Sequence, residues 1–186
     1  MIAPERIAAV VLAAGFSSRF GADKVMHPLG GKPLGAHIAD TLAAIPFAHR
    51  FAVVPTGNEP RAQIFSSRGF DLLQNADPGQ GLSSSLALGA GMAAALGASA
   101  LLLCLADMPF VTRAHLSLLI GTAGDQPVAT VHAGVRSPPA IFPSAMFAEL
   151  MALTGDRGAR PLLEAAATIE ADAAMVRDID SMADLA

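Results

Sequence analysis

Hydrophobic and polar residues change their period repeatedly along the chain, and this predicts alternating strands and helices. Continuous apolar runs with β-branched residues, at 6–14 (RIAAVVLAA) and 99–107 (SALLLCLAD), are typical of strands covered on both faces. In residues 33–45, Leu34, Ile38 and Leu42 recur at helical spacing after an initial proline. The chain therefore begins with a predicted strand followed by a predicted helix.

The same patterns assign the rest of the chain. They predict strands at 50–55, 70–75, 127–133 and 174–180, and helices at 58–68, 83–97, 112–123 and 144–153. One of Ser83, Ser84 or Ser85 is expected to cap the third helix and Thr112 the fourth, because a hydroxyl accepts from the exposed amides of a first turn. Strands alternating with helices predict an α/β fold, with a mostly parallel sheet, helices on both faces and a single domain over residues 1–186.

Composition and charge narrow the class of protein. Hydrophobic residues make up 53% of the 186 residues, but no apolar stretch reaches the roughly 18 residues of a membrane span. The formal net charge of −4 argues against a general nucleic-acid binder or a binder of anionic membranes. The lone Cys104 excludes an intrachain disulfide and, with no signal-peptide pattern, predicts a cytoplasmic protein. No metal-ligand spacing connects the histidines, which we expect at the surface or satisfied in the core: His27, His37, His49, His115 and His132.

Residues 12–24 (LAAGFSSRFGADK), here named the signature segment, combine glycines, serines and two cations directly after the first predicted strand. A glycine-rich turn after a strand exposes backbone N–H groups that bind phosphate oxygens, and Arg19 and Lys24 can neutralise a polyphosphate. The segment has neither the G-x-G-x-x-G spacing of a dinucleotide fingerprint nor the G-K-[ST] of a Walker loop. Taken alone, an ordinary turn explains it equally well.

Carboxylates follow two other predicted strands. Asp107 ends an apolar strand, and it can bind Mg²⁺, which takes one or two carboxylates beside phosphate oxygens, or cap the next turn. Asp178 or Asp180 can supply a second carboxylate, or cap a final helix. Because ligands of such sheets bind beyond the carboxyl ends of the strands, the signature segment and residues 75–85, 106–109 and 178–180 are expected to converge.

Together these motifs resemble the MobA-like nucleotidyltransferase family. The signature segment is similar to the motif of the whole superfamily, and NADPGQGLSSSLALG, LADMP, GDRGAR and DID resemble the molybdenum cofactor cytidylyltransferase branch. The resemblance covers nearly the whole chain in the expected order and implies a Rossmann-like nucleotidyltransferase fold. It also implies Mg²⁺-dependent transfer of CMP from CTP to the terminal phosphate of molybdopterin, with release of pyrophosphate. Ala14 favours the cytidylyl branch, because the guanylyl branch usually has glycine there.

The resemblance implies roles for individual residues. The catalytic residues would be Arg19, Lys24 and Asp107, and the ligands of Mg²⁺ would be Asp107 and Asp180. The nucleotide would contact Leu12, Ala13, Ala14, Gly15, Ser17, Asn75, Gly81 and Ser83. The acceptor would contact Asp156, Arg157 and Arg160, because arginines suit a phosphate.

Partners and alternatives follow from the same resemblance. It implies CTP and molybdopterin as small-molecule substrates, transient contact with a molybdoenzyme or its chaperone, and neither nucleic acid nor membrane. GTP as the nucleotide, or another acceptor such as a sugar phosphate, stays open, as does a catalytically inactive nucleotide-binding regulatory module. Arg19, Lys24 and Asp107 together favour an enzyme. Pro138 and Pro139 stand where relatives commonly show Gly-x-Pro, and this difference is expected to alter the pocket for the acceptor.

Overall fold

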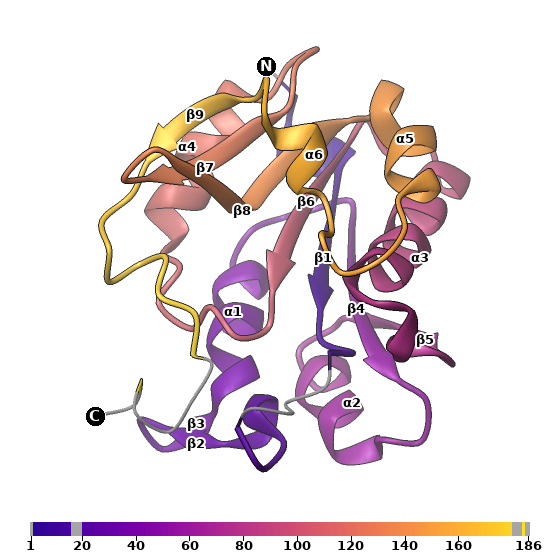
Figure 1. Cartoon of the computed structure of the whole chain (residues 1–186), viewed down its shortest axis with the longest axis vertical. Helices are drawn as coiled ribbons and strands as arrows, with labels where there is room; N and C mark the ends of the chain where they lie inside the picture. The colour runs from indigo at the N-terminus through magenta and orange to yellow at the C-terminus, as the bar shows by residue number, and fades with distance from the viewer. Residues whose placement is uncertain (1, 16–19, 180–183, 185–186) are drawn as a thin grey trace.

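A seven-stranded sheet forms the centre of the computed structural model, which describes residues 2–15, 20–179 and 184 (Figure 1). The strand order is β5-β4-β1-β6-β8-β7-β9. The bounds of these strands are β1 (Ile7–Leu12), β4 (His49–Pro55), β5 (Asp71–Asn75), β6 (Ala100–Leu105), β7 (Val128–His132), β8 (Val135–Pro143) and β9 (Ala167–Glu170). Strand β8 is antiparallel to both of its neighbours, and the other pairs in this sheet are parallel. The predicted mostly parallel sheet is confirmed.

Helices cover both faces of the sheet, as predicted (Figure 1). One face is covered by α1 (Leu34–Ala43), α2 (Glu59–Ser66) and α4 (Arg113–Thr122), and the other by α3 (Leu82–Ala95), α5 (Phe147–Ala152) and α6 (Arg160–Leu163). Successive residues of β1 enter the two core clusters in turn, so its unbroken apolar run reflects burial on both faces. Among the described residues, no helix combines the length and hydrophobicity that crossing a bilayer demands.

Short elements complete the structure. A separate two-stranded sheet pairs β2 (Pro28–Leu29) with β3 (Lys32–Pro33) in antiparallel fashion. Short 3₁₀ helices are η1 (Pro4–Arg6), η2 (Lys24–Met26), η3 (Pro78–Gln80) and η4 (Ser144–Met146). Of these, η2 begins at the last residue of the signature segment, and η3 lies just before α3.

The sequence analysis missed strand β8, because two prolines interrupt its apolar pattern. The register between β7 and β8 shifts after Ala129, so Pro138 and Pro139 lie in an irregular stretch where β7 requires no ladder N–H from them. The Thr130 hydroxyl donates instead to the Pro139 carbonyl at 2.7 Å. A bulge therefore lets a proline-containing segment remain inside the sheet.

The predicted closing strand at 174–180 is wrong. Residues 174–179 form turns and extended chain without a strand partner among the described residues, and the last strand is instead β9, which pairs with β7. The Met175 amide donates to the Asp172 carboxylate at 2.8 Å, so a side-chain-capped turn competes with strand formation. The Ile179 amide donates to the Asp107 carbonyl at 3.1 Å, which places this segment beside the end of β6.

The two predicted helix caps had different outcomes. Thr112 caps α4 as expected, since its hydroxyl accepts from the His115 amide at 3.2 Å. The serine cap of α3 is wrong, because that helix begins one residue earlier and its N-cap is Gly81. Ser84 instead donates its hydroxyl back to the Gly81 carbonyl at 2.8 Å.

Candidate functional site

Lys24 and Asp107 meet at the carboxyl ends of two neighbouring strands. The Lys24 ammonium group donates to Asp107 Oδ2 at 2.6 Å, and the side chains are 16% and 20% exposed. Lys24 is the last residue of the signature segment and the first of η2, and Asp107 follows β6. Because β1 and β6 are adjacent and parallel, the segments that follow them lie at the same edge of the sheet. The expected convergence of these two segments is therefore observed.

Leu82 lines three cavities, of which one is also lined by Lys24 and Asp107. The rim cavity, of about 160 Å³, is lined among others by Leu12, Ala13, Gly15, Lys24 and Asp107. The glycine cavity, of about 370 Å³, is lined by Gly15, Pro78, Gly79, Gly81, Leu82, Ser85 and Asp156. The arginine cavity, of about 200 Å³, is lined among others by Leu86, Leu103, Ser137, Pro138, Asp156, Arg157, Arg160 and Asp178. The signature segment, the start of α3 and residues 155–160 thus border one cleft.

Asp107 has the properties of a ligand for one divalent cation. Its Oδ1 atom is buried and has no hydrogen-bond partner among the described residues, which is unusual for a carboxylate oxygen. Those residues contain no group of three or more His, Cys, Asp or Glu able to hold a metal. One carboxylate still suits Mg²⁺, which takes most of its remaining ligands from substrate phosphates and water. The second predicted ligand, Asp180, lies outside the described residues.

The predicted nucleotide-binding residues separate into two groups. Leu12, Ala13, Gly15 and Gly81 line the cavities, whereas Ala14 lies fully buried in the core cluster that includes α3. Ser17, like the predicted catalytic Arg19, lies outside the described residues. The cavities therefore bring the described start of the signature segment together with the start of α3.

Asn75 and Ser83 line none of the three cavities. The Asn75 amide group donates at 2.9 Å to the hydroxyls of Ser84 and Ser85, and Asn75 is only 4% exposed. Asn75 Oδ1 accepts from the Asp77 amide at 3.0 Å. Asn75 therefore connects the end of β5 to the start of α3.

Residues 155–160, which contain the predicted acceptor residues, dock onto the start of α3. The Ser83 amide donates to the Gly155 carbonyl at 3.1 Å. Gly81 has φ +92°, and a Cβ atom there would lie 2.4 Å from Asp156 Oδ1 and 2.6 Å from the Gly155 carbonyl carbon. Only glycine allows this approach.

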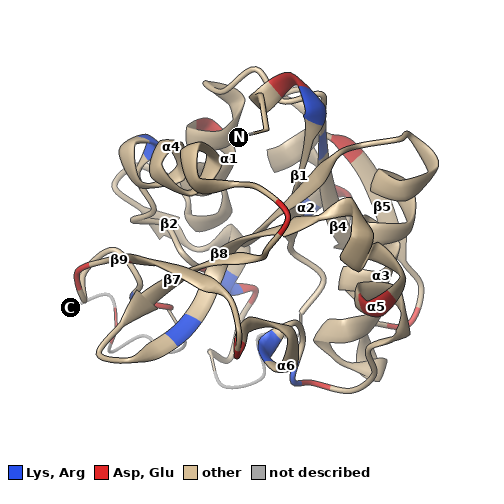
Figure 2. Ribbon diagram, turned by 90° about the horizontal axis from the view of Figure 1, so that it is seen from above, with Lys and Arg blue, Asp and Glu red and all other residues tan. Residues whose placement is uncertain are grey.

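The charges of this acceptor segment are open to solvent. Asp156, Arg157 and Arg160 are exposed at the edge of the arginine cavity, where Figure 2 shows the basic start of α6. The predicted acceptor residues therefore border the same cleft as the predicted nucleotide residues.

The sequence analysis missed Arg61, the most deeply buried charge beside the site. Arg61 lies on α2, is 5% exposed, and donates through Nη1 to the carbonyls of Ala13 at 2.6 Å and Gly15 at 3.2 Å. Its Nη2 and Nε atoms lie 2.6 and 3.0 Å from the two carboxylate oxygens of Asp23, and Asn58 donates to the same carboxylate at 3.1 Å. This two-pronged geometry is the strongest form of Arg–carboxylate contact.

The network around Arg61 also determines the charge state of Asp23. Burial alone would raise the pKa of this carboxyl, but the hydrogen bond and positive charge of Arg61, helped by Asn58, outweigh burial and hold the pKa below its usual range. A sequence signal was present, because Arg61 shares a helix face with the buried Ile64 and Phe65 at i+3 and i+4. A charge on an apolar face indicates a buried partner.

Comparison with known protein families and proteins identifies relatives over most of the chain. Residues 9–171 match the model of the MobA-like NTP transferase domain. The purine catabolism protein PucB of Bacillus subtilis is 33% identical over 92% of this chain and 90% of its own length. A molybdenum cofactor guanylyltransferase of Cereibacter sphaeroides is 34% identical over 79% of this chain and 74% of its own length.

Solved structures share the fold. The homologue of Mycobacterium tuberculosis Rv0371c from Mycobacterium sp. strain JC1 has a TM-score of 0.82 and 29% identity, covering 97% of this chain and 93% of its own. Rv0371c itself, in a complex with manganese, has a TM-score of 0.79 and 23% identity, covering 96% and 95%. The predicted nucleotidyltransferase-type α/β fold is therefore confirmed.

Proposed function

This chain belongs to the MobA-like NTP transferase family, and we propose that it transfers CMP from CTP to the terminal phosphate of molybdopterin, releasing pyrophosphate. The observation that carries the proposal is the Lys24–Asp107 pair, which lies 2.6 Å apart beside Gly15 at the rim cavity. A cation, a carboxylate and a glycine backbone at one strand edge are what a metal-bound triphosphate requires.

The proposed reaction needs no nucleophile from the protein. An oxygen of the acceptor phosphate attacks the α-phosphorus of CTP, forming a new phosphoanhydride bond while the bond to the leaving pyrophosphate breaks. The attacking phosphate is already anionic near neutral pH, so no base has to remove a proton from it. The protein contributes alignment and stabilisation of negative charge.

Lys24 would neutralise charge that develops on the leaving pyrophosphate, with Arg19 and the amides from Gly15 to Gly21 holding the triphosphate. The Lys24 ammonium group must then exchange Asp107 for phosphate oxygens, since it donates to this carboxylate in the structure. Asp107 and Asp180 would hold Mg²⁺, which when bound neutralises phosphate charge. The buried, unpartnered Oδ1 atom of Asp107 supports this role, and the mycobacterial relative of the same fold was solved with manganese.

The base and ribose of the nucleotide would occupy the glycine cavity. Gly81 and Leu82 line this cavity together with Gly15, which also borders the rim cavity. The hydrogen bonds of Asn75 support a positioning role for this residue, which would hold the start of α3 against the nucleotide.

Molybdopterin would bind in the arginine cavity. Arg157 and Arg160 suit a phosphate, because a guanidinium group donates two parallel hydrogen bonds. Leucines of β6 and α3 line the same cavity and offer apolar surface to a flat ring system. The dinucleotide product would then pass to a molybdoenzyme or its chaperone through a transient contact.

GTP is the second candidate nucleotide, because a guanylyltransferase of Cereibacter sphaeroides is 34% identical to this chain. Ala14 favours CTP, since the guanylyl branch usually has glycine at this position.

A direct test offers the protein each of CTP, GTP, ATP and UTP with molybdopterin and Mg²⁺, and measures dinucleotide product and pyrophosphate. We expect product with CTP and none without an acceptor. Faster product formation with GTP than with CTP would assign the chain to the guanylyl branch. Product with a sugar phosphate but not with molybdopterin would change the acceptor, and no product with any pair would favour the regulatory module.

A further inference from the structure

We propose that Arg61 is a positioning residue that holds the two described ends of the signature segment, residues 12–15 and 20–24, in place for triphosphate binding. The proposal rests on the proposed function only in taking this segment as the triphosphate site. Arg61 itself lines none of the three cavities described above. Its effect on a ligand must therefore pass through the groups that it holds.

The guanidinium group of Arg61 contacts the chain both before and after residues 16–19. On the strand side, Nη1 donates to the carbonyls of Ala13 and Gly15 at 2.6 and 3.2 Å. On the other side, Nε and Nη2 bind the carboxylate of Asp23, the residue before Lys24. Arg61 therefore sets the separation between the end of β1 and the start of η2.

These contacts also fix the direction of a backbone amide. In a trans peptide the C=O and N–H groups point in opposite directions, so holding the Ala13 carbonyl determines where the Ala14 N–H points. The Asp23 carboxylate in turn accepts from the Val25 amide at 3.1 Å and caps the η2 turn that carries Lys24. One side chain therefore orients both the entry of the segment and its lysine.

The charge of Arg61 matters as much as its shape. An isolated carboxylate at Asp23, adjacent to Lys24, would weaken the attraction of this site for a polyanion. Arg61 and Asp23 form a closed ion pair with side chains 6% and 26% exposed, so little net charge remains. Asp23 then does not add an uncompensated negative charge beside Lys24 that would repel the phosphates.

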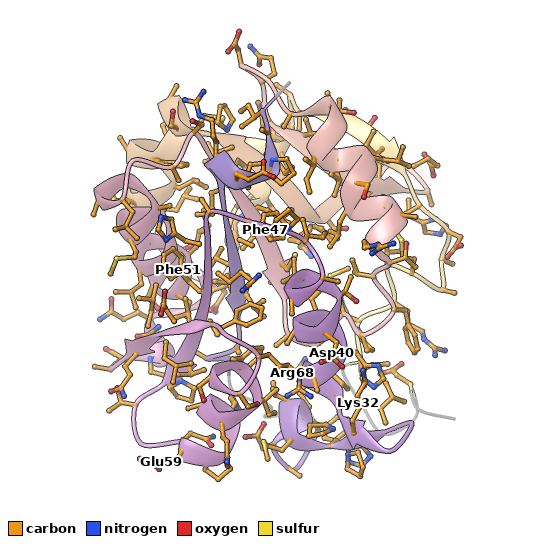
Figure 3. The ribbon with its side chains drawn as sticks, turned by 180° about the vertical axis from the view of Figure 1, so that it is seen from behind. Lys32, Asp40, Phe47, Phe51, Glu59 and Arg68 are labelled. Carbon is orange, nitrogen blue, oxygen red and sulfur yellow. The ribbon has the colours of Figure 1, made fainter. Side chains whose placement is uncertain are left out.

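A second Arg–Asp pair supplies a matched control. Arg68 lies just after α2 and donates through Nε to Asp40 on α1 at 2.5 Å, with side chains 26% and 41% exposed. Figure 3 labels Arg68, Asp40 and Lys32, which lie together on the back of the molecule. Lys32 pairs with the same carboxylate. Neither Arg68 nor Asp40 contacts the signature segment through any hydrogen bond or ion pair among the described residues.

The test compares Arg61→Lys, the double variant Arg61→Gln/Asp23→Asn and the control Arg68→Gln. Lysine keeps the charge of Arg61 but lacks the fork that reaches two carbonyls and a carboxylate at once. The double variant leaves no buried charge alone, and it carries the test if Arg61→Lys does not fold. The probes are inorganic tripolyphosphate with MgCl₂, titrated by calorimetry, and hydrogen exchange of peptides covering residues 12–24 in the ligand-free protein.

We expect Arg61→Lys and the double variant to fold by circular dichroism, to bind tripolyphosphate at least about tenfold more weakly, and to exchange faster in residues 12–24. In turnover assays the KM for CTP should rise, while the KM for the acceptor stays within about twofold. Arg68→Gln should match the wild type within about twofold in every readout.

Folded Arg61→Lys or double-variant protein that binds tripolyphosphate as the wild type does would overturn the inference, and so would a wild type that does not bind it. Failure of the wild type to make the cytosine dinucleotide, with tripolyphosphate binding intact, would instead remove the proposed acceptor or nucleotide. The two failures are therefore distinguishable.

Discussion

The proposed nucleotide side of the cleft, around Lys24 and Asp107, and its proposed acceptor side, around Arg157 and Arg160, hold their charges in different ways. On the nucleotide side, Lys24 is paired with Asp107 at 2.6 Å. On the acceptor side, Arg157 and Arg160 are exposed and make no ion pair with any described residue. Among the described residues, the charges of the first side are therefore already paired without a ligand, whereas the arginines of the second side are open to a ligand phosphate. Substitutions should therefore reduce turnover on the first side and acceptor affinity on the second.

The largest expected effect is that of Asp107→Asn. An amide has no charge to hold Mg²⁺ and leaves Lys24 without its carboxylate, so we expect turnover to fall by about 10³-fold. Initial rates of pyrophosphate release across a Mg²⁺ titration measure this, with circular dichroism as a check of folding. A folded variant with rates within tenfold of the wild type at every Mg²⁺ concentration would show that the nucleotide side does not depend on this carboxylate.

Lys24→Ala should have the next largest effect. Removing one donor that acts on charge in the transition state costs on the order of 3 kcal/mol, or about 10²-fold in turnover. Lys32→Ala is the matched control, because Lys32 pairs with Asp40 on the surface and lines none of the three cavities. Equal rates for the two variants would remove Lys24 from the mechanism.

Arg157→Gln and Arg160→Gln should separate the two sides more finely. Each variant loses a charged donor to the acceptor phosphate, so we expect the KM for the acceptor to rise about tenfold while kcat changes by less than about threefold. Arg113→Gln, at the exposed start of α4, serves as the control. A rise in the KM for CTP, with the acceptor KM unchanged, would assign these arginines to the nucleotide side.

The sequence could predict most of the nucleotide side, because its signals are local. An apolar run predicts β1, a second run predicts β6, and parallel strands place the residues that follow them at one edge. The meeting of Lys24 with Asp107, 83 positions later, follows from this topology. For Arg61, the apolar helix face indicates only that a buried partner exists. No sequence pattern identifies that partner as backbone carbonyls and Asp23.

The acceptor side was predicted less well, because it depends on non-local pairing. Strand β8 carries Pro138 and Pro139 in its interior, and only the bulge opposite β7 makes room for them. The predicted strand at 174–180 was assigned from apolar residues that instead form a turn capped by Asp172. Both errors concern segments whose conformation depends on tertiary contacts.

A buried histidine on α4 is linked to β8 through the hydroxyl of Thr130. His115 on α4 is 5% exposed, and its Nε2 lies 2.8 Å from the Thr130 hydroxyl, which itself donates to the Pro139 carbonyl. Because that hydroxyl proton is used, the histidine must donate through Nε2–H. Burial lowers the pKa of His115 below its ordinary 6.5, although Asp172 opposes this.

The smallest expected effect is a pH dependence of stability from His115. Below its ordinary pKa of 6.5, the unfolded chain takes up a proton that the buried folded imidazole resists, so the unfolding free energy should fall as the pH drops. Above that pH the contribution is fully present. His115→Gln keeps an N–H donor for Thr130 but cannot titrate, so the difference in unfolding free energy between wild type and variant should change between pH 7.5 and 5. Urea unfolding at both pH values measures it, and a difference independent of pH would mean that His115 takes up a proton equally readily in the folded and the unfolded state.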